Sequence, residues 1–324
     1  MNTTQSTCPI CKSDNLKEVY DAREMYYGLR KVFQYAECPD CDALFILNPP
    51  DDMSEFYPEN YHCHSAHESK FSIKQFLTIQ RDRSVMTKSG LLGKAISFFK
   101  SSPTIYQTLS QLNLSLESAI LDVGCGGGRL LQELKHIGFK NLTGIDPYLP
   151  DTLATTQNRF SLIKTSLMEL NHSYDAIILN HSFEHMFDHE AILLRLKQLL
   201  KPDGRVCIRM PLSNSLAWQQ YRTDWFQLDA PRHVIIHSEK SFRELSTRCG
   251  FEIINTIYDS DSKQFLRSEI YKQGTSSNEF INAHNGRYTD FITEDHIQQH
   301  ENLTLQVNKT GKGDQASFIL IQSR

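Results

Sequence analysis

The stretch ILDVGCGGGRLLQEL, from Ile120 to Leu134, decides the fold class of this 324-residue chain. The apolar run that ends at Val123 predicts a buried β-strand, and four glycines follow within five residues. Leucines then recur at Leu130 and Leu134, a spacing that places them on one face of a helix. Because glycine permits close approach to the backbone, the turn between strand and helix predicts a ligand site.

The spacing of the glycines limits the classes of nucleotide cofactor that this turn could bind. The dinucleotide pattern GxGxxG is broken, because Arg129 occupies its third glycine position. An oxidoreductase that uses NAD is therefore the least favoured enzyme class. The pattern is instead Asp122-x-Gly124-x-Gly126-x-Gly128, and a second predicted strand, 141–146, ends in Asp146.

These motifs resemble motif I and the following strand of the class I S-adenosylmethionine-dependent methyltransferases. The resemblance implies an α/β fold, a Rossmann-like doubly wound sheet of seven strands, with S-adenosylmethionine as cofactor. It places Asp122 near the amino group of the cofactor, Asp146 on the ribose and the turn after the third strand beside the adenine. The residues that it assigns to cofactor binding are Asp122, Gly124, Gly126, Gly128, Asp146, Ser166, Leu167 and Asn180.

The rest of the core follows the same alternation of strands and helices. Strands are expected at 118–123, 141–146, 161–168 with its turn, 174–180, 205–210 and 316–322. Helices are expected over 130–137, at about 188–200 and 238–249, and one more near 294–307. The segment KPDG, 201–204, is expected to end the helix before the fifth strand. Apart from the helix near 294–307, residues 272–315 show no clear pattern.

Two CxxC pairs lie in the first fifty residues: Cys8, Cys11, Cys38 and Cys41. Two such loops complete a tetrahedral thiolate site of the kind that suits Zn²⁺. We therefore expect a zinc ribbon at 1–50, a connector with helices at 51–110 and the methyltransferase core at 111–324. Two unrelated pairs or a redox pair remain the alternatives, although neither pair follows a strand and opens a helix.

A second group of metal-binding residue types occurs in the connector, comprising His62, Cys63, His64 and His67. Histidines and aromatic residues in a polar segment are more typical of surface or interface packing than of a metal site. The sequence does not decide whether this group binds anything.

The acceptor is expected beyond the carboxyl ends of strands four and five. An insert, 211–237, follows strand five and holds both tryptophans, which suits a lid or a wall that stacks on a sugar. The alternative is a hydrophobic cover without substrate contact. His233 is the first candidate for a general base, followed by His181 and His185, and each has a structural alternative as a hydrogen-bonded histidine. Arg232 is expected either to bind an acidic acceptor group or to form a salt bridge.

A narrower resemblance rests on the ribbon, on WQQYRTDWFQLDAPRH (218–233) and on NKTGKGDQASFIL (308–320). These features are similar to bacterial zinc-ribbon methyltransferases associated with surface-polysaccharide and glycan biosynthesis. The resemblance implies a small hydroxylated acceptor, such as a sugar or nucleotide-sugar. It leaves open whether oxygen, nitrogen or carbon is methylated, and it leaves the oligomeric state open.

Charge argues against a nucleic-acid substrate. The chain has a net charge of −4, and residues 1–50 carry five basic and seven acidic side chains. The Asp/Asn-Pro-Pro-aromatic stretch of enzymes that methylate base nitrogens is also absent after strand four. An RNA methyltransferase and a non-catalytic cofactor-binding scaffold remain the rival hypotheses. The sequence shows no secretory signal and no membrane segment, and its CxxC pairs suit a reducing compartment, so the cytoplasm is expected.

Overall fold

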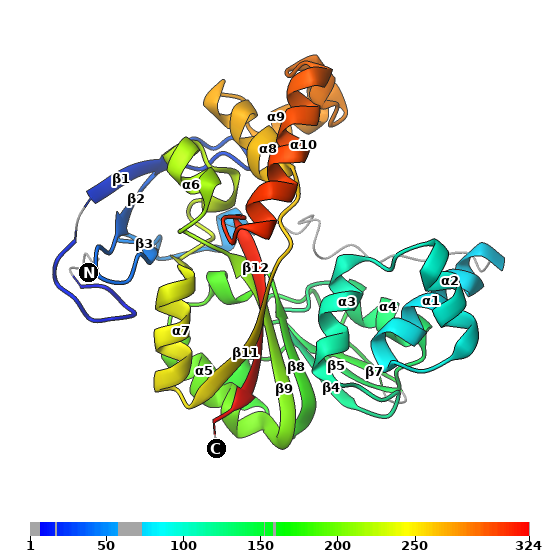
Figure 1. Ribbon diagram of the computed structural model, residues 1–324. Helices are drawn as coiled ribbons and strands as arrows, with labels where there is room; N and C mark the ends of the chain where they lie inside the picture. Colours follow the sequence, from blue (N-terminus) through cyan, green and yellow to red (C-terminus); the bar gives the residue numbers. More distant parts are fainter. Residues whose placement is uncertain (1–6, 17, 58–72, 152, 158–159, 324) are drawn as a thin grey trace.

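The computed structural model describes residues 7–16, 18–57, 73–151, 153–157 and 160–323. Its centre is a twisted sheet in the order β11-β12-β9-β8-β4-β5-β7-β6 (Figure 1). The strands are β4 (Ala119–Val123), β5 (Asn141–Ile145), β6 (Thr155–Gln157), β7 (Phe160–Ile163), β8 (Tyr174–Asn180), β9 (Leu200–Pro211), β11 (Phe251–Tyr258) and β12 (Gln315–Gln322).

The sheet is mostly parallel. Strands β9, β8, β4, β5 and β7 run parallel as neighbours, whereas β12 pairs antiparallel with both β9 and β11. These seven strands confirm the predicted α/β Rossmann-like methyltransferase sheet. The short strand β6 was not predicted, and it adds an antiparallel edge to β7.

Helices cover both faces of the sheet because its central strands are apolar on both sides. On β4, Leu121 packs into one core, which includes Leu193 of α5 (His189–Leu199). Its neighbour Ile120 packs into a second core with Leu131 of α4 (Arg129–Ile137) and Leu109 of α3 (Thr104–Leu109). Helix α7 (Glu239–Arg248) lies on the α5 face, and its Phe242 joins the first core.

One boundary differs from expectation. Helix α5 ends at Leu199 as predicted, but Lys201–Gly204 lie within β9 instead of forming a separate turn. The strand pairing explains the difference, since Leu200 pairs with Tyr174 before the register shifts to Arg205 opposite Ala176. A register shift absorbs the extra residues that sequence reading assigned to a turn.

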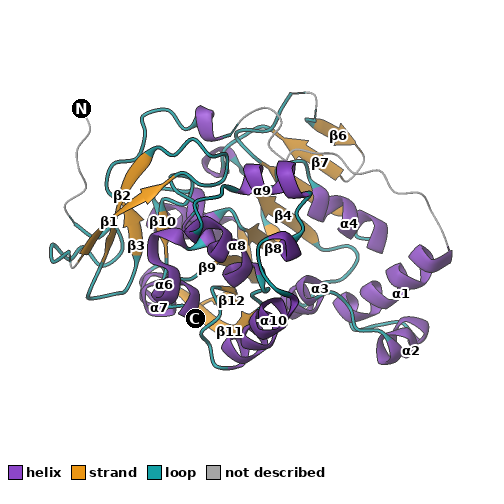
Figure 2. Cartoon of the chain, turned by 90° about the horizontal axis from the view of Figure 1, so that it is seen from above, coloured by secondary structure: helices purple, strands orange, loops and turns teal. Residues whose placement is uncertain are grey.

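The N-terminal residues form a second sheet, β1 (Glu18–Arg23), β2 (Val32–Glu37) and β3 (Leu44–Ile46). A fourth strand, β10 (Ile235–Ile236), comes from the 211–237 insert and pairs antiparallel with β3. The sheet therefore joins segments almost two hundred residues apart in the chain. Helices α1 (Ile73–Thr87) and α2 (Leu91–Phe99) lie on the opposite side of the molecule, near α3 and α4 (Figure 2).

The insert and the C-terminal region add helices beyond the end of β12 (Figure 1). These are α6 (Leu216–Tyr221), α8 (Lys263–Lys272), α9 (Ser277–His284) and α10 (Glu294–Lys309). Helix α10 lies where the sequence predicts one, and α9 occupies part of the region that showed no pattern. Within the described residues, no helix combines the length and apolar composition that crossing a bilayer requires.

Candidate functional site

A cavity opens beside the glycine turn after β4. It is bounded by the loops that follow β4, β5 and β8, the usual place for a ligand in an open α/β sheet. The N-terminal segment closes one side. The lining residues are Met53, Tyr57, Gly124, Gly126, Asp146, Pro147, Tyr148, His181, Ser182, His185, Met186 and Phe187.

The glycine turn has a backbone that other residues would strain. Gly124, Gly126 and Gly128 have φ values of 73°, 49° and 74°. A Cβ at Gly124 would lie 2.4 Å from the Cβ of Ser182, so this position has no room for a side chain. Gly124 and Gly126 line the cavity, whereas Gly128 faces Leu162 and begins α4.

Asp146 is held by the backbone at the cavity wall. Its Oδ2 accepts a hydrogen bond from Gly126 N at 3.0 Å, and its Oδ1 accepts one from Tyr148 N at 2.8 Å. Asp122 lies behind the turn, and burial, together with the charge of Asp146, raises its pKa to about 7. A cationic group in the cavity would favour the ionised form of both carboxylates. Two carboxylates that accept hydrogen bonds fit a ligand with an amino group and ribose hydroxyls.

The other predicted cofactor residues lie outside the lining of this cavity. Ser166 precedes a short 3₁₀ turn, and the Leu167 side chain is buried in the core. Asn180 Oδ1 accepts a hydrogen bond from Arg209 Nη1 at 3.4 Å. The structure therefore brings Gly124, Gly126 and Asp146 together but leaves these three side chains elsewhere.

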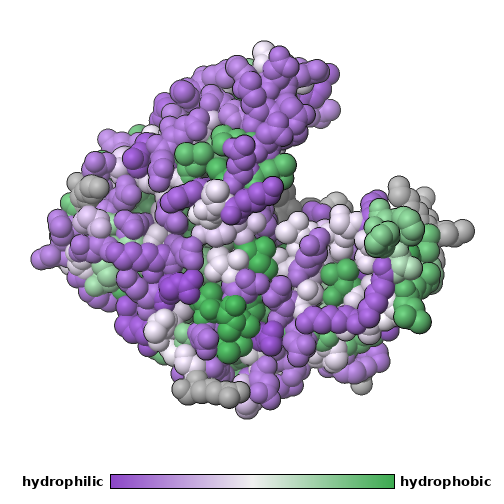
Figure 3. Space-filling view, in the orientation of Figure 1, coloured by the Kyte–Doolittle hydropathy of each residue, from purple (hydrophilic) through white to green (hydrophobic). Residues whose placement is uncertain are grey.

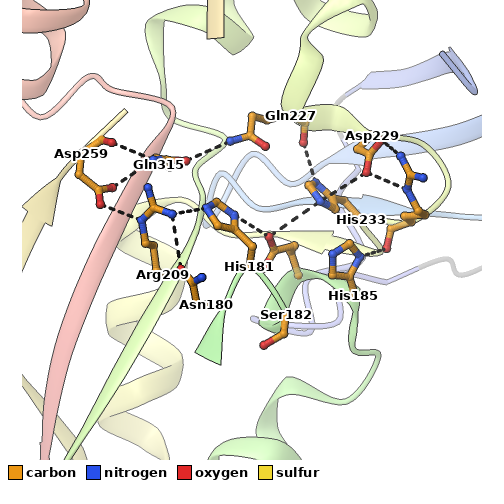
Figure 4. Close-up of polar contacts among 12 residues, drawn as sticks. Asn180, His181, Ser182, His185, Arg209, Gln227, Asp229, His233, Asp259 and Gln315 are labelled. Carbon is orange, nitrogen blue, oxygen red and sulfur yellow. Dashed lines mark hydrogen bonds and ion pairs between the residues drawn. The ribbon is translucent and has the colours of Figure 1, made fainter. Parts of the chain in front are cut away.

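Three histidines meet a buried glutamate beside the cavity (Figure 4). Glu184 comes from the 3₁₀ turn after β8 and is 1% exposed. Burial opposes its ionisation, but the hydrogen bond and charge of His181, with the charges of His233 and His185, lower its pKa to about 2. One donor atom from each of Glu184, His185 and His233 lies within 4.8 Å of the others. These three side chains can share a proton or hold a cation between them.

His185 is the member of this group that lines the cavity, and no hydrogen bond from the described residues reaches its Nε2. Its Nδ1 lies 2.9 Å from the carbonyl oxygen of Arg232. Because a carbonyl only accepts, this contact places the ring proton on Nδ1 and leaves the lone pair on Nε2. The Tyr57 hydroxyl lies 3.1 Å from the same Nδ1 and helps to fix the ring.

The other two candidate bases differ from His185 in their contacts, although His181 also lines the cavity. His181 is engaged on both nitrogens, with Nδ1 3.2 Å from Glu184 Oε1 and Nε2 2.7 Å from Arg209 Nη1. His233 is 5% exposed, outside the cavity lining, and its Nδ1 donates to the Gln227 carbonyl at 2.7 Å. Burial, with the charge of His185, lowers the pKa of His233 to about 4, so it is neutral at neutral pH. The first candidate from sequence is therefore a neighbour of the cavity, not part of its wall.

The structure decides between the two alternatives for the tryptophans and between the two for Arg232. Trp218 and Trp225 are each 1% exposed, so neither forms a lid nor a stacking wall. Trp218 packs edge-on against Tyr20 of the N-terminal sheet at 5.2 Å, which makes it part of a buried interface. Arg232 is also buried and forms a bidentate ion pair with Asp229, so it does not bind an acceptor.

Sequence reasoning missed the apolar part of the cavity. Tyr57 and Tyr148 are parallel within 3°, with ring centroids 5.5 Å apart. Met53, Met186 and Phe187 complete this side. The only available signal was the position of Tyr148 two residues after Asp146, since Met53 and Tyr57 lie far earlier in the chain.

The four N-terminal cysteines converge as their spacing predicts. Sγ of Cys8 lies 3.6 Å from that of Cys41, and Sγ of Cys11 lies 3.5 Å from that of Cys38. Four sulfurs around a tetrahedral Zn²⁺ with bonds of about 2.3 Å lie about 3.8 Å apart, which is close to these distances. The second group, His62, Cys63, His64 and His67, lies outside the described residues.

Comparison with known proteins identifies the enzyme class. A family model described as "Methyltransferase domain" matches residues 100–256. The chain is 34% identical over 167 residues to a ubiquinone biosynthesis O-methyltransferase of Rickettsia canadensis, covering 46% of this chain and 70% of that protein.

Two further proteins are similar over different extents. The mitochondrial ubiquinone biosynthesis O-methyltransferase of Bos taurus is 31% identical over 103 residues, 28% of this chain. The chain spans only 27% of that protein's length. A cyclopropane synthase structure from Mycobacterium tuberculosis aligns with a TM-score of 0.45 and 15% identity, covering 78% of this chain and 99% of that one.

Proposed function

Because the chain belongs to the S-adenosylmethionine-dependent methyltransferases, we propose that it methylates a hydroxyl group of a small acceptor, with a sugar or nucleotide-sugar as first candidate. The observation that carries this proposal is the position of His185. It lines the same cavity as Gly124 and Asp146, with a lone pair on Nε2. A cofactor site and a proton acceptor therefore share one space.

The residues at the glycine turn would hold the cofactor. Gly124 and Gly126 leave space for it at the backbone, and Asp146 is positioned to accept hydrogen bonds from its ribose. Asp122 would lie behind the turn as a counter-charge to its amino group. When bound, S-adenosylmethionine supplies an activated methyl group on a cationic sulfur. Holding donor and acceptor in line is the main contribution that such a cavity makes to the rate.

We infer that His185 is the general base. A hydroxyl must lose its proton as it attacks, and a positioned histidine accelerates such a step by roughly 10²–10⁴-fold. Proton uptake at Nε2 makes His185 cationic, and the buried Glu184 carboxylate stabilises that charge. His181 and His233 would position this carboxylate and ring instead of exchanging protons with the acceptor.

A phenolic acceptor is the second candidate. Tyr57, Tyr148 and Phe187 give the cavity an aromatic wall, which suits a planar ring as well as the apolar face of a sugar. The relatives named for ubiquinone biosynthesis O-methylation favour a phenol. Both candidates present a hydroxyl to His185, so the chemistry is shared and only the ring differs.

The test is a methyl-transfer assay with labelled S-adenosylmethionine. The acceptors are a panel of nucleotide-sugars, a panel of catechols and phenols, and bulk RNA. Label on a nucleotide-sugar supports the first candidate, and label on a phenol supports the second. Label on RNA, or cofactor binding without transfer to any panel, would contradict the proposal and favour the RNA or scaffold hypothesis.

We also propose that Cys8, Cys11, Cys38 and Cys41 hold a structural Zn²⁺. The residue after each CxxC has a positive φ, and its N–H donates to the backbone carbonyl of the first cysteine of the pair. The distances are 3.0 Å from Lys12 to Cys8 and 2.8 Å from Asp42 to Cys38. Both loops thus have the same turn and point their sulfurs to one centre. One equivalent of zinc by elemental analysis, lost in Cys41→Ser but not in Cys207→Ser, is the expected result.

A further inference from the structure

Helix α2 has its apolar face directed to solvent. Leu91, Leu92, Phe98 and Phe99 are 88%, 53%, 87% and 87% exposed. Residues spaced by one, seven and eight positions lie on the same side of a helix. Figure 3 shows apolar residues gathered on the side of the molecule where α1 and α2 lie. A monomeric soluble protein ordinarily buries such a face.

The inward face of α2 explains why the apolar face stays outside. Gly93 is buried, and a Cβ there would lie 2.1 Å from the Gln80 carbonyl oxygen and 2.5 Å from the Ser84 Cβ. Helices α1 and α2 approach each other so closely at this point that only glycine fits between them. Rotating α2 to bury Phe98 or Phe99 would put a large side chain into that contact. Helix α2 therefore directs its apolar face outward, and its packing against α1 prevents the rotation that would bury that face.

Basic residues frame the exposed apolar face. Lys88, Lys94 and Lys100 are exposed and lie before, within and just after α2. The sequence contains no aspartate or glutamate from residue 84 to residue 116. The segment therefore presents uncompensated positive charge beside leucine and phenylalanine side chains, in a protein whose overall charge is −4.

We propose that α2 is an interfacial anchor that lies on the surface of an anionic lipid bilayer. A short helix with phenylalanine and leucine on one face and lysines on its border suits that interface, where apolar side chains enter the acyl boundary and lysines meet phosphates. Charge complementarity favours this occupant over a second copy of the chain, because two copies facing each other would oppose their lysines. With nine residues in the helix, the attachment is reversible and rests on both contributions.

The test is co-sedimentation of the full-length protein with phosphatidylcholine vesicles, with or without one third phosphatidylglycerol. Binding is expected to the anionic vesicles only and to weaken with added salt. The variant Leu91→Ser/Phe98→Ser/Phe99→Ser should abolish it without loss of folding, since the three side chains are almost fully exposed. The matched control is Ile281→Ser/Leu305→Ser, which removes exposed apolar side chains from α9 and α10 and should bind as the unaltered protein does.

A lysine series separates the electrostatic contribution. Each Lys→Gln change at positions 88, 94 and 100 should weaken binding by about fivefold, which corresponds to about 1 kcal/mol per lysine. Failure to bind anionic vesicles at low salt would overturn the proposal, and so would unchanged binding by the serine variant. A dimer in sedimentation velocity that the serine variant abolishes would assign the face to a second copy instead. None of these readouts depends on methyl transfer.

Discussion

The hydroxyl of Tyr35 lies 2.7 Å from the backbone carbonyl oxygen of His233 and donates a hydrogen bond to it. Tyr35 belongs to β2 of the N-terminal sheet and is fully buried, whereas His233 belongs to the insert after β9. The bond lies beside the pairing of β3 with β10, and Ser238 Oγ donates to the Cys41 carbonyl nearby at 2.6 Å. The N-terminal sheet is thus attached to the acceptor side of the cavity.

Tyr35→Phe should weaken this attachment. The His233 carbonyl would lose a buried partner, which costs about 1–3 kcal/mol in the free energy of unfolding. We expect a lower urea midpoint and a lower kcat with unchanged cofactor affinity. Tyr106→Phe is the control, because its partner Glu133 is partly exposed and can bind water instead. Equal losses in both variants would argue against a special role for Tyr35.

Asp146→Ala should weaken cofactor binding by about 100-fold, the effect of losing about 3 kcal/mol of charge-assisted hydrogen bonds. The same change also frees Gly126 N and Tyr148 N. Calorimetry with S-adenosylhomocysteine measures the affinity. Asp151→Ala removes an exposed carboxylate and should leave it unchanged. Undiminished affinity in the Asp146 variant would refute the ribose assignment.

Cofactor affinity should rise between pH 5.5 and pH 7.5. Burial and Asp146 raise the pKa of Asp122 to about 7, so this carboxyl is mostly neutral at the lower pH and ionised at the upper one. Only the ionised form attracts a cationic amino group, which remains protonated over this range. Calorimetry at several pH values should show the rise in the unaltered protein and a flatter profile in Asp122→Asn. Identical profiles would remove Asp122 from the site.

His185→Gln should lower kcat by roughly 10²–10⁴-fold while sparing cofactor affinity. His233→Asn should cost less, because this ring lies outside the cavity lining. His136→Gln, on the exposed side of α4, serves as control and should be silent. Timed assays with the acceptor that the methyl-transfer panel identifies give the rates. A larger loss for His233 than for His185 would restore the first candidate from sequence.

The pattern of residues that are neighbours in sequence was sufficient to predict the elements of the core. The strand, glycine turn and helix of 120–137 depend on residues that are neighbours in sequence, so their spacing predicts both the structure and the cofactor class. The same holds for Asp146, because the end of one parallel strand lies beside the end of the next. The cysteine pairs also carry their geometry in their spacing, and their sulfurs converge as expected.

Contacts between segments that are distant in the chain decided the positions of the tryptophans, the histidines and Tyr57. The tryptophans suggest a lid because aromatic residues suit one, yet Trp218 is buried against Tyr20 of the N-terminal sheet, and Trp225 is buried with its indole nitrogen donating to Asp314. The roles of the three histidines likewise depend on partners that are distant in the chain, such as Arg209 for His181 and Arg232 for His185. Tyr57 reaches the cavity from the N-terminal segment, a contact that no sequence spacing encodes.

The sequence by itself determined the enzyme class, the sheet and the glycine turn at the cavity wall, since each follows from periodicity and from glycines within a few residues of one another. Only the tertiary structure decided which partners engage each histidine, which aromatic residues line the cavity and which face of α2 meets solvent. These depend on burial and on long-range partners, and a close contact such as Gly93 against Gln80 has no signature in the spacing of residues.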